Sequence, residues 1–349
     1  MIVLDTNQLR AVGCEQNTKL TLLRGVARFT GHPLAIPEIV EQEYLGWYRR
    51  SVDEALGTVT QADHITDRMR DKLLGLVPWW VGRPQFARGE PGENLPILTE
   101  AVKRRQQLLH NIFTILPTPP GAADEGNKRE VERRPPAVVS GDSGKGGRDT
   151  VVWLTTLAEA QRCRPSNLYF VAKDRGFGSK HLLPELQAEA PSNLVYLDSV
   201  DRLLNRLSCP ADPPLPPDEL INTDLVQQAV RNCVSSGNFK IDLHAWPQEL
   251  GSAPIDLDHE LFPQPRKDET LACRLGEDVL VATNRVWGVR WRYLEVPRGT
   301  SDNGPGAEKT LDVSVRLALL AVFEDDELVR ASVFSRGGLR GHDTVDDER

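Results

Sequence analysis

The stretch IVLDTN, residues 2–7, sets the fold class of this chain. Three apolar residues lead into Asp5-Thr6-Asn7, a pattern that predicts a buried strand running into a turn. Short apolar runs recur in LAIP (34–37), NLYFVAKD (167–174) and NLVYLDSV (193–200), and stretches with helical spacing separate them. Strands that alternate with helices predict an α/β fold in which a parallel sheet carries helices on both faces.

The segments between these strands carry apolar residues at helical spacing. Thr18 is a candidate N-cap, and Pro37 stands at the favoured first position of the next helix. The stretch 117–147 is rich in Pro and Gly and is expected to be a long loop. The predicted helices cover residues 18–30, 38–77, 98–115, 149–162, 180–190, 200–207 and 223–237.

A Pro-rich stretch, CPADPPLPP (209–217), is the clearest linker in the chain. Beyond it, a helix is followed by strand patterns, and residues 311–323 and 328–334 flank EDDE as the strands of a hairpin do. We therefore expect three parts. They are an α/β domain over residues 1–208 with an insertion at about 51–145, a linker over 209–222, and a smaller α+β domain over 223–349.

The net charge of −8 argues at first against a nucleic-acid partner. The first 200 residues, however, carry nearly equal numbers of basic and acidic side chains, and residues 101–150 are locally basic. A local basic patch matters more to a phosphate backbone than the total charge does. The five cysteines form no CxxC pair, and neither a membrane-spanning run nor a signal peptide is recognised. These features predict a cytoplasmic protein.

Several common catalytic motifs are missing from the sequence. The run GDSGKG (141–146) resembles a phosphate-binding loop, but its glycines are too close together and Gly146 replaces the hydroxyl residue that would bind Mg²⁺. No GxGxxG follows a strand, no Cys/His set has zinc spacing, and no GxSxG elbow is present. A nucleotide-binding P-loop, a dinucleotide site and a serine hydrolase are therefore excluded.

Four acidic residues stand at the ends of predicted elements. Asp5 closes the first strand, Asp174 closes a later one, Asp149 opens a helix, and Glu43 lies in the helix after LAIP. The carboxyl ends of parallel strands and the N-termini of helices face one crevice, so these side chains can converge. Clustered carboxylates repel unless a cation lies among them, and hard oxygen ligands suit Mg²⁺ or Mn²⁺. The set predicts a metal site for phosphodiester hydrolysis.

Each of these carboxylates alone also fits a structural role. Asp5 and Asp174 fit turns, Glu43 fits a solvated helix face, and Asp149 fits a helix N-cap. For any single residue the structural role is the better interpretation, whereas the ordered combination favours the metal site.

In these positions the chain resembles the PIN domain nucleases. The matching positions are Asp5-Thr6-Asn7, Pro37 with 40–43 (VEQE), Asp149, and Ala172-Lys173-Asp174 with Phe177. More specifically, the chain resembles a bacterial PIN-like subgroup. The positions that carry this resemblance are Arg129-Glu130, Pro135-Pro136, the Gly-Arg-Asp start of the helix, and Trp153. The resemblance covers roughly residues 1–207, interrupted by the insertion. The insertion and the C-terminal domain depart from a minimal PIN domain.

The resemblance implies a metal-dependent endoribonuclease that cleaves single-stranded RNA by metal-activated water. It implies that Mg²⁺ or Mn²⁺ is held by the four carboxylates, and it leaves DNA open as a substrate. A toxin-like or defence-related role fits the same family. The alternative is a catalytically inactive PIN-fold adaptor that binds RNA or a protein. A homodimer or a protein partner engaged through the C-terminal domain is a further expectation.

Polar residues beside the carboxylates are candidates for substrate contact. Lys145 and Arg148 flank Asp149, and Lys173 adjoins Asp174. Phosphate contact and plain surface exposure are both open for these three cations. By resemblance, Asn7 supports the first Asp and lies where substrate would bind.

Two aromatic sets have alternative interpretations. Trp153 has the apolar spacing of a core residue, which is favoured over a platform on which bases stack. Trp287 and Trp291 alternate with Arg290 and Arg292 in a strand pattern, which fits a reader of single strands or, more simply, a sheet with a core face and a solvent face. The acidic run LDHE (257–260) is a weak candidate for metal binding.

Overall fold

The computed structural model describes residues 1–13, 17–61, 95–140, 143–178, 180–235, 259–263, 269–295 and 307–342. Its N-terminal part is built on a parallel sheet with the strand order β3-β2-β1-β6-β7. The strands are β1 (Ile2–Leu4), β2 (Leu34–Pro37), β3 (Thr114–Leu116), β6 (Leu168–Val171) and β7 (Leu194–Leu197). The predicted α/β class with a parallel sheet is confirmed.

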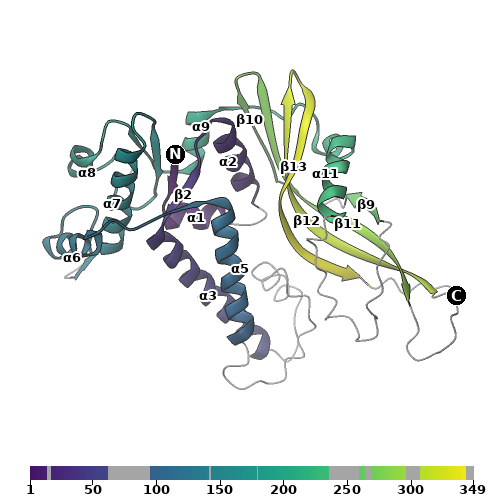
Figure 1. Cartoon of the computed structure of the whole chain (residues 1–349), viewed down its shortest axis with the longest axis horizontal. Coiled ribbons are helices and arrows are strands. Elements are labelled where there is room, and N and C mark those ends of the chain that lie inside the picture. The colour runs from purple at the N-terminus through teal and green to yellow at the C-terminus, as the bar shows by residue number, and fades with distance from the viewer. Residues whose placement is uncertain are drawn as a thin grey trace.

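Helices cover both faces of this sheet. Figure 1 shows α7 and α8 on one side and α2 and α9 on the other, while α3 and α5 project together from the carboxyl end of the sheet. The helices of this part are α1 (Thr6–Val12), α2 (Thr18–Phe29), α3 (Glu38–Gln61), α5 (Leu95–Ile112), α6 (Ala122–Glu132), α7 (Gly147–Arg162), α8 (Pro184–Glu189) and α9 (Val200–Leu207).

Three local predictions near the first two strands need correction. The residues Asp5-Thr6-Asn7 do not form a turn, because α1 begins at Thr6 directly after the strand. The N-cap of α2 is Asn17 rather than Thr18, since the Asn17 side chain accepts a hydrogen bond from the Leu20 amide at 3.1 Å. Pro37 ends β2, and α3 starts one residue later.

The stretch predicted as a long loop is more ordered than its composition suggests. It contains α6 and a hairpin of β4 (Val138–Ser140) and β5 (Ser143–Lys145). The insertion also supplies β3, which extends the parallel sheet at the edge beside β2. The Pro and Gly residues lie at the ends of these short elements. The sequence prediction was wrong because it took them as a sign that the whole segment is a loop.

The C-terminal part is an antiparallel sheet with helices, as expected for the α+β region. Its strands are β8 (Cys209–Pro210), β9 (His259–Pro263), β10 (Glu269–Leu275), β11 (Asp278–Glu295), β12 (Ala307–Glu324) and β13 (Glu327–His342). The predicted hairpin around EDDE is confirmed, with Asp325 and Asp326 in the turn. The helices α10 (Pro217–Ile221) and α11 (Asp224–Ser235) precede most of the sheet, and α11 packs on β13.

Helix α2 joins the two sheets into one hydrophobic core. Leu23 and Val26 of α2 share a buried cluster with Leu280 and Leu320 of the antiparallel sheet. At Gly25 an added Cβ would lie 2.9 Å from a methyl carbon of Leu320, so a larger residue there would displace the Leu320 side chain. The C-terminal sheet is therefore packed on the outer side of α2, away from the parallel sheet (Figure 1).

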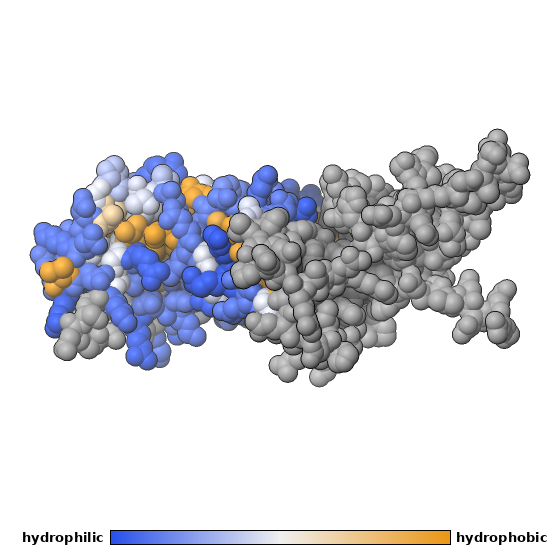
Figure 2. All heavy atoms as spheres, turned by 90° about the horizontal axis from the view of Figure 1, so that it is seen from below, coloured by the Kyte–Doolittle hydropathy of each residue, from blue (hydrophilic) through white to orange (hydrophobic). Residues whose placement is uncertain are grey.

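The described surface is mainly polar. On the face drawn in Figure 2, hydrophobic side chains occur in small scattered groups among hydrophilic ones. In the part of the chain that the structure describes, no helix has the length and apolar character needed to span a membrane.

Candidate active site

The fold brings the four predicted carboxylates to the carboxyl edge of the parallel sheet. Asp5 follows β1, Asp174 lies three residues after β6, Asp149 is in the first turn of α7, and Glu43 is in the second turn of α3. Their charges act on one another: Asp174 and Glu43 each raise the pKa of Asp5 and of Asp149. The four carboxylates therefore lie near enough at this edge of the sheet to influence one another electrostatically.

Asp5 is the most buried member of this carboxylate cluster. Its side chain is 4% exposed, and its Oδ2 atom has no hydrogen-bond partner. Burial, followed by the charges of Asp174 and Glu43, raises its pKa to about 6, although backbone amides of Thr6 and Asn7 oppose the shift. A buried carboxylate oxygen without a partner is costly, so this atom is suited to accept a ligand.

Asp149 does not cap its helix. The N-cap position of α7 is Gly146, so Asp149 is the third residue of the helix, within electrostatic range of the other carboxylates. Burial first, then the charges of Asp174, Asp5 and Glu43, raise the pKa of Asp149 to about 7, while Arg148 opposes this. Burial and the neighbouring negative charges therefore both disfavour the ionised form of Asp149, and its position in the helix is not that of an N-cap.

A glycine fixes the approach to Asp149. Gly146 has φ 119°, and a Cβ there would lie 2.8 Å from Cα of Ala137 and 3.2 Å from Oδ2 of Asp149. Any other residue would push the hairpin or the carboxylate out of place.

Glu43 differs from the buried Asp5 and the half-buried Asp149 because side chains of the protein already pair with both of its oxygens. Thr6 Oγ1 donates to its Oε2 at 2.8 Å, and Arg148 Nη1 lies 2.9 Å from its Oε1. This ion pair is solvent-exposed, with 68% of the Arg148 side chain and 35% of the Glu43 side chain accessible. An exposed pair of this kind contributes about 0–1 kcal/mol, so it can be exchanged at little cost.

Asp174 is oriented by its own turn. Its Oδ1 accepts a hydrogen bond from the Gly176 amide at 2.8 Å. The turn role considered for Asp174 is therefore present, and it leaves the second carboxylate oxygen available to the cluster.

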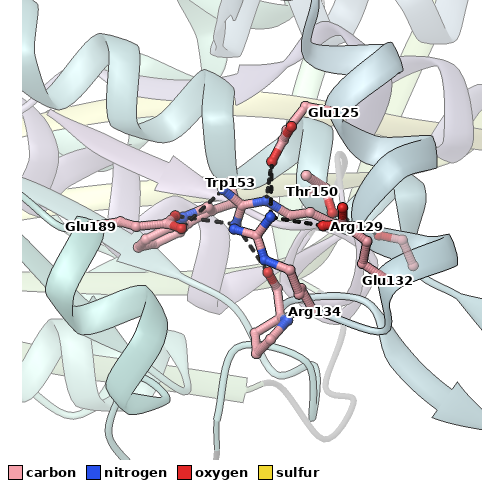
Figure 3. Close-up of polar contacts among 9 residues, drawn as sticks. Glu125, Arg129, Glu132, Arg134, Thr150, Trp153 and Glu189 are labelled. Atoms are coloured by element: carbon pink, nitrogen blue, oxygen red, sulfur yellow. Dashed lines mark hydrogen bonds and ion pairs between the residues drawn. The ribbon is translucent and has the colours of Figure 1, made fainter.

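A network around the buried Arg129 supports the first turns of α7 on the side of α6 and α8. Arg129 of α6 is 6% exposed in its side chain and forms a two-pronged ion pair with Glu189 of α8, at 2.9 and 3.1 Å. Its Nε donates to Glu125 at 2.9 Å, and Nη1 donates to the carbonyl of Pro135 at 3.0 Å. Figure 3 shows Arg129 at the centre of these contacts.

Two further bonds connect this arginine network to α7. Trp153 is fully buried, and its Nε1 donates to Glu189 at 2.8 Å, as Figure 3 also shows. Glu130, next to Arg129, accepts a hydrogen bond from the Gly147 amide at 2.8 Å. The network thus fixes the position of the first turns of α7, and with it the position of Asp149. The prediction that Trp153 is a core residue is confirmed.

In the sequence, Arg129-Glu130 stood out only as part of a family pattern, Trp153 also as a core residue, and Glu189 was missed. The pattern of charged residues ahead of a Gly-Arg-Asp helix start was the one signal that pointed to the network. Glu189 lies 60 residues from Arg129 in the chain, and nothing in the local sequence around it indicates a partner.

The remaining candidates for substrate contact lie on the surface around the cluster. Asn7, Lys145 and Lys173 are exposed. The backbone of Trp287–Arg292 lies in β11, but their side chains are outside the described residues, as are residues 257–258 of LDHE and the side chains of His259 and Glu260.

The chemistry of the cluster fits a hard divalent cation. Within the described ranges no three or more Asp, Glu, His or Cys side chains form a group already arranged to hold a metal ion. The unpartnered buried Oδ2 of Asp5 and the raised pKa values of Asp5 and Asp149 are nevertheless what a cation would relieve. The donors are carboxylate oxygens, which Mg²⁺ and Mn²⁺ prefer.

A comparison with family models finds one described as PIN domain, which matches residues 2–177. No match was found among curated proteins or among solved structures. The matched residues contain the parallel strands β1, β2, β3 and β6 and the whole carboxylate cluster.

Proposed function

The chain belongs to the PIN domain family, whose members typically bind divalent metals, and on this premise we propose that it is a metal-dependent endonuclease acting on single-stranded RNA. The observation that carries the proposal is the buried Oδ2 of Asp5, which has no partner inside a group of four carboxylates. A purely structural aspartate at this place would have a donor within the protein.

The four carboxylates have distinct parts in this proposal. Asp5 and Asp149 are the ligands whose burial makes a cation most favourable, and Asp174 offers the oxygen that its turn leaves open. Thr6 fixes one oxygen of Glu43, so Glu43 can complete the set with the other. A bound Mg²⁺ or Mn²⁺ would stabilise the charge that develops on the phosphodiester and lower the pKa of a water molecule.

In this proposal Arg148 pairs with Glu43 when no cation is bound and with a substrate phosphate when one is. Without a cation its guanidinium neutralises Glu43 at 2.9 Å. When Glu43 serves as a ligand, the guanidinium is released beside the cluster, where it can bind a substrate phosphate. Lys145 is exposed on β5, close to the same helix start, and adds to the positive charge that a phosphate meets.

The choice of RNA over DNA rests on the family resemblance, so the test uses both. Purified full-length chain is incubated with single-stranded RNA and DNA, with Mn²⁺, with Mg²⁺ and with chelator, and products are resolved on a gel. We expect cleavage of RNA that needs the metal and is lost in Asp149→Asn. Cleavage that persists in chelator, or that is unchanged in Asp149→Asn, would contradict the proposal.

One observation favours a second candidate, a non-catalytic PIN-fold adaptor. Glu43 is already satisfied by Thr6 and Arg148, as in a site that has lost its metal. An adaptor would bind single-stranded RNA or a protein with equal affinity in chelator and in Mn²⁺. The same assay therefore separates the two, because only the nuclease consumes its substrate.

A further inference from the structure

A pocket of about 480 Å³ lies beside the carboxylate cluster and has no part in the chemistry above. Its wall is formed by α1, by the first turns of α2 and α9, and by the turn after β6. The polar side chains that line it are those of Asn7, Gln8, Lys19, Lys173, Ser199 and Asp201.

Hydrogen bonds hold the floor of the pocket in shape. Gln8 is 5% exposed, and its Oε1 accepts from the Val200 amide at 3.2 Å. Ser199 caps α9 by accepting from the Arg202 amide at 3.3 Å. The start of α9 is therefore tied to α1, and the positive end of the helix dipole faces the pocket.

The pocket carries a net positive charge next to a strongly acidic cluster. Lys19 Nζ lies 2.8 Å from Asp201 Oδ1, in a pair with 33% and 65% of the two side chains exposed. Such a pair is weak, and the ammonium keeps further N–H donors for another acceptor. Lys173 is exposed, and within the described residues no hydrogen bond or ion pair engages it.

The position of the pocket relates it to the cleavage site. Asn7 follows Asp5 by two residues, and Lys173 directly precedes Asp174, so the pocket and the cluster share one edge of the sheet. Lys19 and Asp201 belong to the α2 and α9 side of the sheet, whereas Arg148 and Asp149 belong to the α7 side (Figure 1). Positive side chains thus stand on both sides of the carboxylates.

We propose that this pocket binds a nucleotide of the single-stranded substrate that flanks the cleaved bond, with Lys19 and Lys173 contacting its phosphate. The strand crosses the carboxyl edge of the sheet from the α7 side to the α9 side, passing over the carboxylates. This inference rests on the proposed function, because it gives a path to the same substrate. Asn7 lines the pocket two residues after Asp5 and would contact the nucleotide that spans the pocket and the carboxylate cluster.

The test measures binding of a short single-stranded RNA to the full chain in the Asp149→Asn background, so that nothing is cut, at several salt concentrations. Lys19→Gln combined with Lys173→Gln should weaken binding roughly five- to tenfold at low salt. It should also flatten the slope of log affinity against log salt by about 0.7, the change expected on a single strand when one phosphate is no longer neutralised. Lys128→Gln, an exposed lysine on α6 outside the pocket, is the matched control.

A charge variant of opposite sign sharpens the test. Asp201→Asn removes the negative charge of the pocket and should strengthen RNA binding by roughly two- to threefold at low salt. Protection of residues 199–201 from hydrogen exchange on RNA binding should be seen in the parent and be reduced in the double lysine variant. Affinity and salt slope equal to those of Lys128→Gln, with residues 199–201 unprotected, would overturn the proposal.

Cleavage and binding assays distinguish a wrong pocket proposal from a wrong nuclease proposal. If the wild type cleaves RNA and the lysine variants bind and cleave it as the wild type does, the pocket proposal is wrong and the nuclease proposal stands. If the wild type never cleaves but RNA binding still depends on the two lysines, the pocket is supported and the catalytic proposal is wrong.

Discussion

Two groups of charged side chains flank the first turns of α7, and they differ in how their charges are satisfied. Behind the helix, Arg129 is paired with Glu189 and Glu125 and also donates to a backbone carbonyl. In front of it, Asp5 and Asp149 face other carboxylates, and Oδ2 of Asp5 has no partner.

The difference separates a structural network from a binding site. A buried charge whose donors and acceptors are all used inside the chain serves the fold, because nothing further can be gained by binding there. Carboxylates that are buried together without a counter-charge reduce stability until a cation arrives. The same helix thus uses one group to fix its position and presents the other to a ligand.

The largest expected effect comes from breaking the satisfied network. Arg129→Met removes a buried cation and leaves Glu189, whose side chain is 30% exposed, and the Pro135 carbonyl without their donor, so the free energy of unfolding should fall by about 3 kcal/mol. Arg134→Met, on an arginine that is 47% exposed, is the matched control and should lower the free energy of unfolding much less. Urea unfolding measures both. Equal losses would show that the Arg129 contacts are no more than surface pairs.

Removing charge from the unsatisfied group should act on activity instead. Asp149→Asn keeps the size of the side chain and should reduce RNA cleavage by roughly 10²–10³-fold, as expected for loss of a group that stabilises the transition state. The melting temperature without metal should be equal to or above that of the parent, because one repelling charge is gone. A variant that loses stability as Arg129→Met does would place Asp149 in the structural group.

The two groups also differ in their response to pH. The pKa values of Asp5 and Asp149 in the folded chain, about 6 and about 7, lie above the ordinary value of 3.8. Between these values the folded state binds more protons than the unfolded state, so the free energy of unfolding falls as pH rises from about 4 to about 7. For Asp5 alone the difference corresponds to roughly 3 kcal/mol.

Urea unfolding between about pH 4 and about pH 8, without metal, measures this loss. Asp5→Asn should flatten the pH dependence, and saturating Mn²⁺ should reverse it. A pH dependence that is the same in Asp5→Asn as in the parent would mean that other groups cause it.

The smallest expected effect is a change in Mn²⁺ affinity when Arg148, the cation paired with Glu43, is replaced. Arg148→Gln removes the cation that pairs with Glu43 and should tighten Mn²⁺ binding by roughly three- to tenfold, while RNA binding weakens. Lys145→Gln changes the total charge equally but touches no carboxylate in the described residues, so it is the control. Titration calorimetry with Mn²⁺ gives both affinities. If Lys145→Gln tightens Mn²⁺ binding as much as Arg148→Gln does, the gain reflects overall charge and not the pair with Glu43.

The sequence predicted the parts of the fold that local patterns encode. The apolar runs of β1, β2, β6 and β7 were found because a buried parallel strand is a continuous apolar segment. The strand β3 was missed because Thr114–Leu116 is only three residues long and borders a Pro-rich stretch. The helix α6 was missed because its polar composition and flanking glycine and prolines are typical of a loop.

The candidate site shows the same limit. Asp5, Glu43, Asp149 and Asp174 could be named because strand ends and helix starts meet at one edge of a parallel sheet. The pairing of Arg148 with Glu43 joins residues 105 positions apart, and that of Arg129 with Glu189 joins residues 60 apart. Which carboxylate has a partner and which has none depends on side-chain packing, and no sequence spacing encodes it.

The most direct test of the central claim is the change in melting temperature on adding Mn²⁺, compared between the parent and the Asp5→Asn/Asp174→Asn double variant. In the parent, Mn²⁺ at about one hundred times its Kd should stabilise the fold by about 2.7 kcal/mol and raise the melting temperature by several degrees. Asn at 174 can still accept from the Gly176 amide, so the turn is kept. The double variant should lose the response. An unchanged rise in the double variant would place the metal outside the carboxylate cluster and contradict the account.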